Sequence, residues 1–251
     1  MYAAMIAAAI CFFTTGCGGK NDTAAVYDTT LYSPEYAKGF AIVCDKDSVP
    51  AIMIRNPWQG ADSVSICYRL EKPAERIVAM SSTFVAMLES LGAVDRIVGV
   101  SGRGYISSDA IRNCGDKVAD VGYDTGVDYE KLVMLEPDVV LLYGVNGPSP
   151  IEEKLKELAI PYIYIGDYLE ESPLGKAEWV VAIGEIIGKR KESEDIFAGI
   201  AKRYNTRKER YSRSSVRPKV MINAPYNDSW WMPSTSNYMA QLIADAGGDY
   251  I

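Results

Sequence analysis

The sequence contains no histidine among its 251 residues. Histidine is the commonest side chain in general acid-base catalysis, so its absence excludes Ser-His-Asp and Cys-His catalytic arrangements within this chain. Histidine clusters are also the basis of most zinc and manganese transport sites, and none can form here. We therefore predict no catalytic residue, no metal site and no cofactor.

Basic residues are also in the minority. Lysine and arginine number 26 against 33 aspartates and glutamates, which gives a net charge of −7 and a pI near 4.8. A nucleic-acid-binding surface needs clustered positive charge, so this balance argues against one. The hydrophobic content of 48% is ordinary for a globular protein with a core and excludes general disorder.

The apolar stretch at the N-terminus is too short to span a bilayer. It runs into Thr-Gly-Cys and a polar segment, a pattern typical of an export signal. The Gly16-Cys17 junction resembles a bacterial lipobox, although Thr14 stands where leucine is usual. We predict a signal over residues 1–17, lipidation of Cys17 and a membrane-anchored lipoprotein facing the periplasm. The alternative is a plain secretory signal with an incidental cysteine.

Few cysteines remain for disulfides after export. Loss of Cys11 with the signal and lipidation of Cys17 would leave Cys44, Cys67 and Cys114, an odd number in an oxidising compartment. A bridge between Cys44 and Cys67 is one arrangement, and the sequence leaves it open.

Hydrophobic patterning predicts an α/β protein with two Rossmann-like lobes joined by a long helix, the second lobe incomplete. Four short apolar runs alternate with helical patterns, which indicates a parallel α/β lobe. Three strand-like segments before it indicate an antiparallel meander. The predicted regions are a tether (18–37), the meander packed on the first lobe (38–72), the N-terminal α/β lobe (73–172), linking helices (173–213) and the start of a C-terminal α/β lobe (214–251).

The linking helices are predicted to break at Gly188. The second of them, from about Lys191 to Tyr211, would span ~30 Å at 1.5 Å per residue, enough to connect two lobes. One strand and one helix then follow before Ile251, too few elements to close a second lobe. We therefore expect the sequence to be truncated at its C-terminus.

Residues 123–144 read YDTGVDYEKLVMLEPDVVLLYG, a short helix and a buried strand with a tyrosine at each end. Asp128 is the predicted N-cap of the helix, and the run VVLL is apolar on both faces like a covered parallel strand. Ligands of open α/β sheets bind beyond the carboxyl ends of the strands. Tyr143 lies at such an end, and Tyr123 lies in a loop at the same edge.

Three stretches carry a resemblance to a known family. They are RIVAMSSTFVAMLESLGAVDRIVGVSGRGY from residue 76, VGYDTGVDYEKLVMLEPDVVLLYG from residue 121 and WWMPSTSNYMAQLIADAGGDY from residue 230. The pattern D-x-E-x-x-x-x-L-x-P-D-V-V at 128–140 is the most specific. In this order they resemble the substrate-binding proteins of ABC importers for iron-siderophores, haem and cobalamin. The resemblance implies two α/β lobes that hold the ligand in the groove between them.

The resemblance and the strand ends together predict a ligand-binding groove. Arg103 would suit an anionic chelate or propionate. Adjacent side chains of an extended segment point to opposite faces, so we assign only one of the two neighbouring tryptophans to the groove. For each tyrosine the alternative is a structural role at the rim of the core. The predicted ligand-binding residues are Ser82, Arg103, Tyr105, Tyr123, Tyr143 and Trp231.

Two further assignments concern residues outside the groove. Tyr162 and Tyr164 share one face of a strand interior, so we assign both to core packing. Glu130 matches the family position whose carboxylate docks on arginines of the membrane permease. Its alternative role is a helix N-terminal charge with no partner. The corresponding position of the second lobe falls near Ser236, which is not acidic.

We therefore predict a monomeric binding lipoprotein that captures an iron chelate, haem or cobalamin and delivers it to an ABC permease. The sequence does not distinguish these ligands, and tyrosine ligation of haem iron stays open. The alternative is a carboxylate-dependent surface hydrolase on a similar scaffold. That chemistry needs a close pair of carboxylates, whereas the candidate loops offer only Asp109, Asp124 and Asp228, widely spaced in the sequence.

Overall fold

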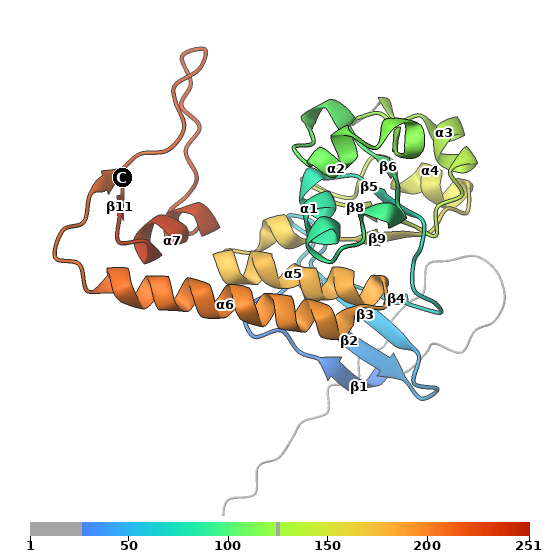
Figure 1. The fold of residues 1–251 in the computed structure, drawn as a ribbon, viewed down its shortest axis with the longest axis horizontal. Coiled ribbons are helices and arrows are strands. Elements are labelled where there is room, and N and C mark those ends of the chain that lie inside the picture. The colour runs from blue at the N-terminus through green and yellow to red at the C-terminus, as the bar shows by residue number, and fades with distance from the viewer. Residues whose placement is uncertain (1–26, 124–125) are drawn as a thin grey trace, which may run out of the picture.

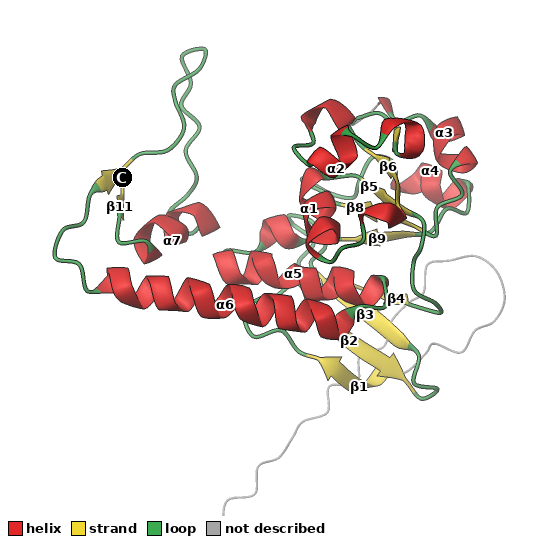
Figure 2. Cartoon of the chain, viewed as in Figure 1, coloured by secondary structure: helices red, strands yellow, loops and turns green. Residues whose placement is uncertain are grey.

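The computed structural model describes residues 27–123 and 126–251 (Figure 1). The predicted export signal, its lipidation site at Cys17 and the first part of the predicted tether lie outside these residues. The described chain combines a five-stranded parallel sheet, a four-stranded antiparallel sheet and a pair of long helices (Figure 2). This arrangement confirms the predicted α/β class.

The antiparallel sheet comes first in the described chain, and its strands pair in sequence order. Three of its strands confirm the predicted meander. The prediction of a flexible tether is wrong for Tyr27–Tyr32, because this segment forms a strand that pairs with its neighbour. The strands are β1 (Tyr27–Tyr32), β2 (Phe40–Asp45), β3 (Pro50–Arg55) and β4 (Ser65–Arg69).

The parallel sheet has the strand order β7-β6-β5-β8-β9. Its central strands are buried on both faces, as the apolar runs predict. The sequence pattern missed the two-residue β7, which is too short to show a period. The strands are β5 (Ile77–Ala79), β6 (Ile97–Val100), β7 (Ala119–Asp120), β8 (Val139–Leu142) and β9 (Tyr162–Tyr164).

Short helices connect the parallel strands. Asp128 caps α3 as predicted, since its side chain accepts a hydrogen bond from the backbone N–H of Lys131. The segment SPIE at 149–152 has the sequence of a capping box but does not form one, because Glu152 is the first residue of its helix and its carboxylate accepts from two tyrosine hydroxyls. The helices are α1 (Ser82–Ser90), α2 (Asp109–Arg112), α3 (Tyr129–Met134) and α4 (Glu152–Glu157), with 3-10 turns at Val94–Arg96, Arg103–Tyr105, Gly115–Lys117 and Asp167–Leu169.

Two long helices, α5 (Pro173–Ile186) and α6 (Arg190–Ser212), pack against each other. They are separated at Gly188, whose φ of +70° favours glycine, and this confirms the predicted break. The first of them contacts both α1 of the parallel lobe and β2 of the antiparallel sheet. Trp179 is fully buried at that junction, with its ring 4.9 Å from that of Phe40. Both sheets therefore share one hydrophobic core around α5.

Two buried carboxylates attach the β1–β2 connection to this core. Glu178 of α5 accepts hydrogen bonds from the Tyr32 hydroxyl at 2.7 Å and from the backbone N–H groups of Glu35, Tyr36 and Ala37. Nearby, Glu170 accepts from the next two backbone N–H groups and from the Trp179 indole. Because buried backbone donors need partners, these carboxylates fix the path of a segment that has no regular structure.

The C-terminal segment, residues 214–251, is attached to the end of α6 (Figure 1). It contains the parallel pair β10 (Lys219–Val220) and β11 (Asp249–Tyr250) and the helix α7 (Tyr238–Asp245). Asp245 anchors this helix to α6 by accepting from the Tyr204 hydroxyl at 2.6 Å and pairing with Lys208 at 3.1 Å. Among the described residues, no helix combines the length and apolarity that a membrane crossing requires.

Candidate ligand-binding site

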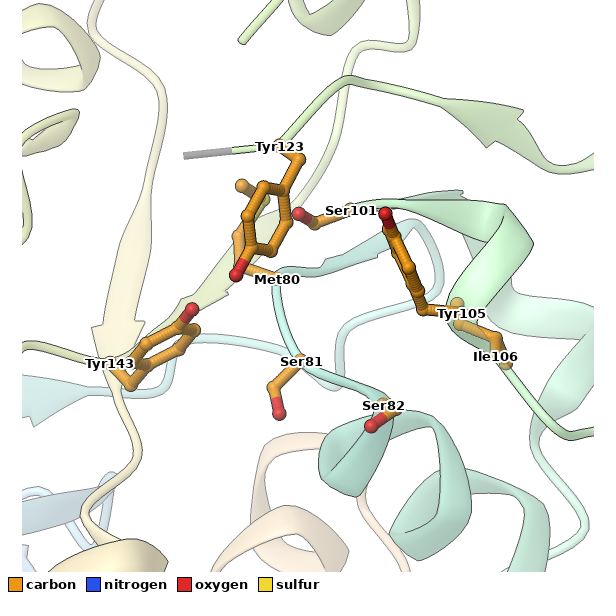
Figure 3. A pocket seen from close by; sticks show the side chains of 8 residues that line it. All are labelled: Met80, Ser81, Ser82, Ser101, Tyr105, Ile106, Tyr123 and Tyr143. Carbon is orange, nitrogen blue, oxygen red and sulfur yellow. The ribbon is translucent and has the colours of Figure 1, made fainter. Parts of the chain in front are cut away.

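A cavity of about 440 Å³ opens at the carboxyl edge of the parallel sheet (Figure 3). Its walls come from the segments that follow β5, β6 and β7 and from the end of β8. Carboxyl ends of neighbouring parallel strands meet at one edge, so side chains distant in sequence converge there. The lining residues are Met80, Ser81, Ser82, Ser101, Tyr105, Ile106, Tyr123 and Tyr143.

A second cavity of about 340 Å³ adjoins the first. The two share Met80, Ser101, Tyr123 and Tyr143, and the remaining wall of the second comes from the loop 144–151. We call the combined lining of both cavities the groove wall. Tyr123 and Tyr143 border both of its compartments. The structure brings together four of the six predicted ligand-binding residues, namely Ser82, Tyr105, Tyr123 and Tyr143.

Tyr105 and Tyr123 are unusually exposed for aromatic side chains, at 83% and 60%. Their rings lie 6.1 Å apart with planes tilted by 50°. The loops that carry them are joined by Asp120, whose carboxylate accepts from the backbone N–H groups of Gly102, Arg103 and Gly122. These three hydrogen bonds to one carboxylate fix the backbone of both loops relative to each other. The rings of Tyr105 and Tyr123 therefore lie side by side although neither is buried.

Tyr143 is partly buried and packs on α1. Its ring meets that of Phe84 edge to face, with centroids 6.4 Å apart. The chain after it turns at Gly144, whose carbonyl accepts a hydrogen bond from the Tyr168 hydroxyl. Burial of Tyr168 raises the pKa of its phenol, so the hydroxyl stays a donor. This hydrogen bond connects Gly144, which lines the second compartment, to the 3-10 turn Asp167–Leu169 that precedes α5.

The amino end of α1 supplies the hydroxyl groups of the groove wall. Ser81 is the N-cap, and its side chain accepts from the backbone N–H of Thr83. Ser82 follows with an exposed side chain that lines the first cavity. The local fold follows from sequence, because serine at the N-cap starts the helix directly where β5 ends.

Arg103, predicted to contact ligand, does not line either cavity. Its guanidinium donates to the carbonyls of Ile111 and Val118 at 3.2 and 3.3 Å, and lies 3.5 Å from the Cys114 sulfur. The first carbonyl belongs to α2 and the second to the residue directly before β7. Arg103 therefore connects these two elements and lines neither cavity.

Trp231 is also outside the cavities. It lies on the loop between β10 and α7 with 80% of its surface exposed. Trp230, which we assigned to inward packing, is 40% exposed and donates from its indole N–H to the Ile222 carbonyl. The structure therefore shows no contact between this loop and the groove wall, and a role for Trp231 in binding stays a prediction.

The remaining predicted residues fall where their assignments placed them in the fold. Glu130 is exposed in the first turn of α3. Tyr164 is fully buried and Tyr162 partly buried, and both hydroxyls donate to Glu152 at 2.5 and 2.8 Å. Burial alone would raise the pKa of Glu152, but Lys156 and the two hydroxyls outweigh it and lower that pKa. This confirms the assignment of both tyrosines to the core.

The described cysteines are all free thiols, so a Cys44–Cys67 bridge is not formed. These two residues lie on β2 and β4, which are separated by β3. Two strand spacings amount to about 9.6 Å, beyond the reach of a disulfide. Burial raises the pKa of Cys67 to about 11, which makes it unreactive. Within residues 27–123 and 126–251, no cluster of cysteine and carboxylate side chains could hold a metal ion.

The chain belongs to the periplasmic binding protein family, which it matches over residues 77–251. This family contains the substrate-binding components of ABC importers and not enzymes, which excludes the hydrolase alternative. The antiparallel sheet precedes the matched region.

Individual relatives agree with this assignment. An uncharacterized lipoprotein of Methanocaldococcus jannaschii is 29% identical over 190 residues, covering 71% of this chain and 45% of the relative. The chain spans about half the length of the curated relatives it matches. Two solved structures share the fold alone. One is a possible iron-binding periplasmic solute-binding protein of Staphylococcus epidermidis (TM-score 0.58, 15% identity, covering 71% of this chain and 67% of that one). The other is the periplasmic vitamin B12 binding protein of Vibrio cholerae (TM-score 0.52, 16% identity, 71% and 66%).

Proposed function

We propose that this protein captures a bulky metal-organic ligand, namely an iron chelate, haem or cobalamin, and passes it to an ABC permease. The observation that carries the proposal is the cluster of Tyr105, Tyr123 and Tyr143 around a cavity at the carboxyl edge of the parallel sheet. Two of these rings, those of Tyr105 and Tyr123, are exposed beside the cavity, and exposed aromatic groups around a cavity mark a ligand-binding site. The groove wall binds one face of that ligand.

The size of the groove supports a large ligand. The two compartments hold about 440 and 340 Å³, and together they fall in the range of sites for drug-sized molecules. The names of two structural relatives point the same way, since one is a possible iron-binding protein and the other binds vitamin B12. A sugar or an amino acid would leave most of the groove wall uncovered.

The proposed location is the membrane surface, to which a lipid on Cys17 would anchor the protein. The Gly16-Cys17 junction and the matching relative named as a lipoprotein support it. A Cys17→Ala variant, expressed in the native host, should move from the membrane fraction to the soluble exported fraction. Unchanged partitioning into membranes would contradict the anchor.

The proposed delivery surface includes Glu130 on α3. Its side chain is exposed and lies in the first turn of a helix at the same end of the lobe as the groove. Reversal of its charge, Glu130→Lys, should slow ligand uptake by cells while binding by the purified protein stays unchanged, because opposite charges steer docking. Glu136→Lys, also exposed and at the other end of the helix, is the matched control. Monomeric behaviour in solution is part of the same proposal.

The test of the proposed function is a binding assay on the protein as it occurs in its host. We expect protein purified from the native host to carry the absorption bands of a ferric chelate, haem or corrinoid. Stripped protein should then quench its tryptophan fluorescence when titrated with one of these three ligand classes. A protein that copurifies with none of them and binds none of them would contradict the proposal.

A further inference from the structure

The groove wall carries no formal charge among the residues that the structure describes. Its polar groups are serine and tyrosine hydroxyls in the first compartment (Figure 3). In the second, Asn146 and Ser149 add an amide and a further hydroxyl. The other lining groups are apolar side chains, prolines and a glycine. Residues 124 and 125, which lie outside the described set beside Tyr123, are aspartate and threonine, and neither is basic.

Two cations beside the groove loops are committed elsewhere. Arg103 follows the strand that ends at the groove, but its guanidinium is held by the carbonyls of Ile111 and Val118. Lys131 donates to the Asp120 carbonyl at 2.9 Å and pairs with Asp128 at 3.4 Å. A buried anion in the groove would find neither charge available.

One cation contacts the groove wall, since Arg112 donates to the Ile106 carbonyl at 3.2 Å, but it also pairs with Asp109 at 3.5 Å. The ionised group that joins the two groove loops is an acid. Asp120 accepts backbone hydrogen bonds from the loops that carry Tyr105 and Tyr123, and its side chain is exposed. A carboxylate at this position repels a ligand anion at short range. The hydroxyl of the N-cap Ser81 already accepts from the backbone N–H of Thr83, the second residue of α1, which reduces the pull of that helix end on an anion.

We propose that the groove wall selects ligands whose contacting face is uncharged. It favours amide-bearing corrinoids and neutral ferric hydroxamate chelates over haem propionates and carboxylate chelates. Serine, tyrosine and asparagine side chains both donate and accept, which suits amide and hydroxamate groups. A carboxylate buried against the same wall loses its hydration and gains no charged partner. This inference rests on the proposed function and specifies its ligand class.

Matched ligand pairs test the selectivity directly. Cyanocobalamin is compared with its monoacid, in which one propionamide is hydrolysed to a carboxylate of the same shape, and haem dimethyl ester is compared with haem. A neutral ferric trihydroxamate is compared with the same chelate bearing one free carboxylate. We expect the neutral member of the binding pair to bind about tenfold tighter, because an unpaired buried charge costs more than 1 kcal/mol. Affinity of the neutral ligand should not change between low and high salt.

A variant that adds a positive charge to the groove wall provides a second test of the selectivity. In Ser82→Lys a cation replaces an exposed hydroxyl of the groove wall, so the carboxylate ligand should bind about threefold to fivefold tighter, as for an exposed ion pair. Ser107→Lys adds the same charge at an exposed position outside both cavities and should change neither affinity.

The outcomes separate the two proposals. If an anionic ligand binds as tightly as its neutral partner in the parent protein, or more tightly at low salt, the selectivity is wrong and the binding function stands. Equal effects of Ser82→Lys and Ser107→Lys on the anionic ligand would also contradict the selectivity. If no member of any pair binds, the proposed function fails and the selectivity fails with it.

Discussion

Two tryptophans show how differently the two regions of the molecule are built. Trp179 of α5 is fully buried where the antiparallel sheet meets the parallel lobe, whereas Trp231 of the C-terminal segment is 80% exposed. The contrast extends to the surroundings of each. The described part of residues 27–212 contains two large buried hydrophobic clusters, while the only buried apolar side chain of residues 214–251 in the described structure is Ala240. The stability of the chain therefore resides in the first region, which also presents the groove wall.

This difference explains how the groove wall can be exposed to solvent and still hold one conformation. Each of its tyrosines belongs to a loop held by buried or well-bonded groups of the first region, such as Asp120 and Tyr168. The loop that carries Trp231 is held by hydrogen bonds within the exposed C-terminal segment itself, such as those from Trp230 to the Ile222 carbonyl and from Asn223 to the Trp231 carbonyl. Binding energy at a fixed wall is not lost to ordering of the protein, so the first lobe should dominate affinity.

The largest difference between the two regions is expected when each tryptophan is truncated in a separate variant. Trp179→Ala removes a buried ring at the junction of both sheets and should lower the free energy of unfolding by about 4 kcal/mol. Trp231→Ala should lower it by less than about 0.5 kcal/mol, because the ring is exposed. Urea denaturation of the full chain, followed by circular dichroism, measures both. Similar losses would mean that the C-terminal segment is packed as well as the first region.

The buried carboxylate of Glu178 should have the next largest effect. Each carboxylate oxygen of Glu178 accepts from two of the four donors. In Glu178→Gln an amide NH₂ group replaces one oxygen and faces two donors that it cannot accept from, so we expect a loss of about 3 kcal/mol. The matched control is Glu171→Gln, which removes an exposed pair with Lys38 and should cost less than about 0.5 kcal/mol. Chemical denaturation at neutral pH compares them. A silent Glu178→Gln would mean that the β1–β2 connection does not depend on this carboxylate.

A smaller effect is expected for the hydroxyl of Tyr164. Tyr164→Phe removes its hydrogen bond to Glu152 and should cost about 2 kcal/mol, whereas Tyr226→Phe in the exposed C-terminal segment should cost almost nothing. The folded-state pKa of Glu152 is lowered below 4.5. Its contribution is therefore present above that pH and is lost as pH falls through the folded pKa.

The acid dependence provides the check on this assignment. Stability measured between about pH 7 and about pH 3 should fall less steeply for Tyr164→Phe than for the parent, because the carboxylate is then held by fewer donors. An identical slope in both proteins would mean that the tyrosine hydroxyl does not stabilise the ionised form of Glu152.

The smallest effect on overall stability should follow cleavage of the C-terminal segment. Trypsin should cut first after Arg213 or Lys219, which are exposed and follow the last turn of α6, and should spare residues 76–190. The remaining fragment should keep an almost unchanged unfolding transition. Mass spectrometry of timed digests identifies the sites. Early cuts within the parallel lobe would reverse the comparison between the regions.

The sequence predicted the elements whose signals are local. The apolar runs located four strands of the parallel sheet, Asp128 was identified as a cap, and the predicted break at Gly188 occurs where φ is positive. Four groove residues followed from one rule, that ligands bind at the carboxyl edge of such sheets. Ser101 could have been found in the same way, since it directly follows β6.

What could not be predicted depends on partners distant in sequence. The strand β1 looks polar and exposed, and its order comes from β2 and from Glu178, about 150 residues away. Arg103 follows a strand end as a ligand contact should, yet carbonyls of a later segment take its guanidinium. Local sequence carries no signal for either outcome.

The most direct test of the central claim is the affinity of tyrosine variants. Each of Tyr123 and Tyr143 should bury about 80 Å² against the ligand, which at ~25 cal/mol per Å² corresponds to about 2 kcal/mol of binding free energy. Truncation of either tyrosine should therefore raise the dissociation constant roughly thirtyfold. Fluorescence titration of the full chain with haem, cobalamin and a ferric hydroxamate compares Tyr123→Ala and Tyr143→Ala with Tyr162→Ala and Tyr164→Ala. The account predicts that the first two lose affinity, while the last two lose folding stability and keep the affinity of the folded fraction. If Tyr123→Ala and Tyr143→Ala both bind the best ligand as tightly as the parent protein, the groove wall is not the binding site.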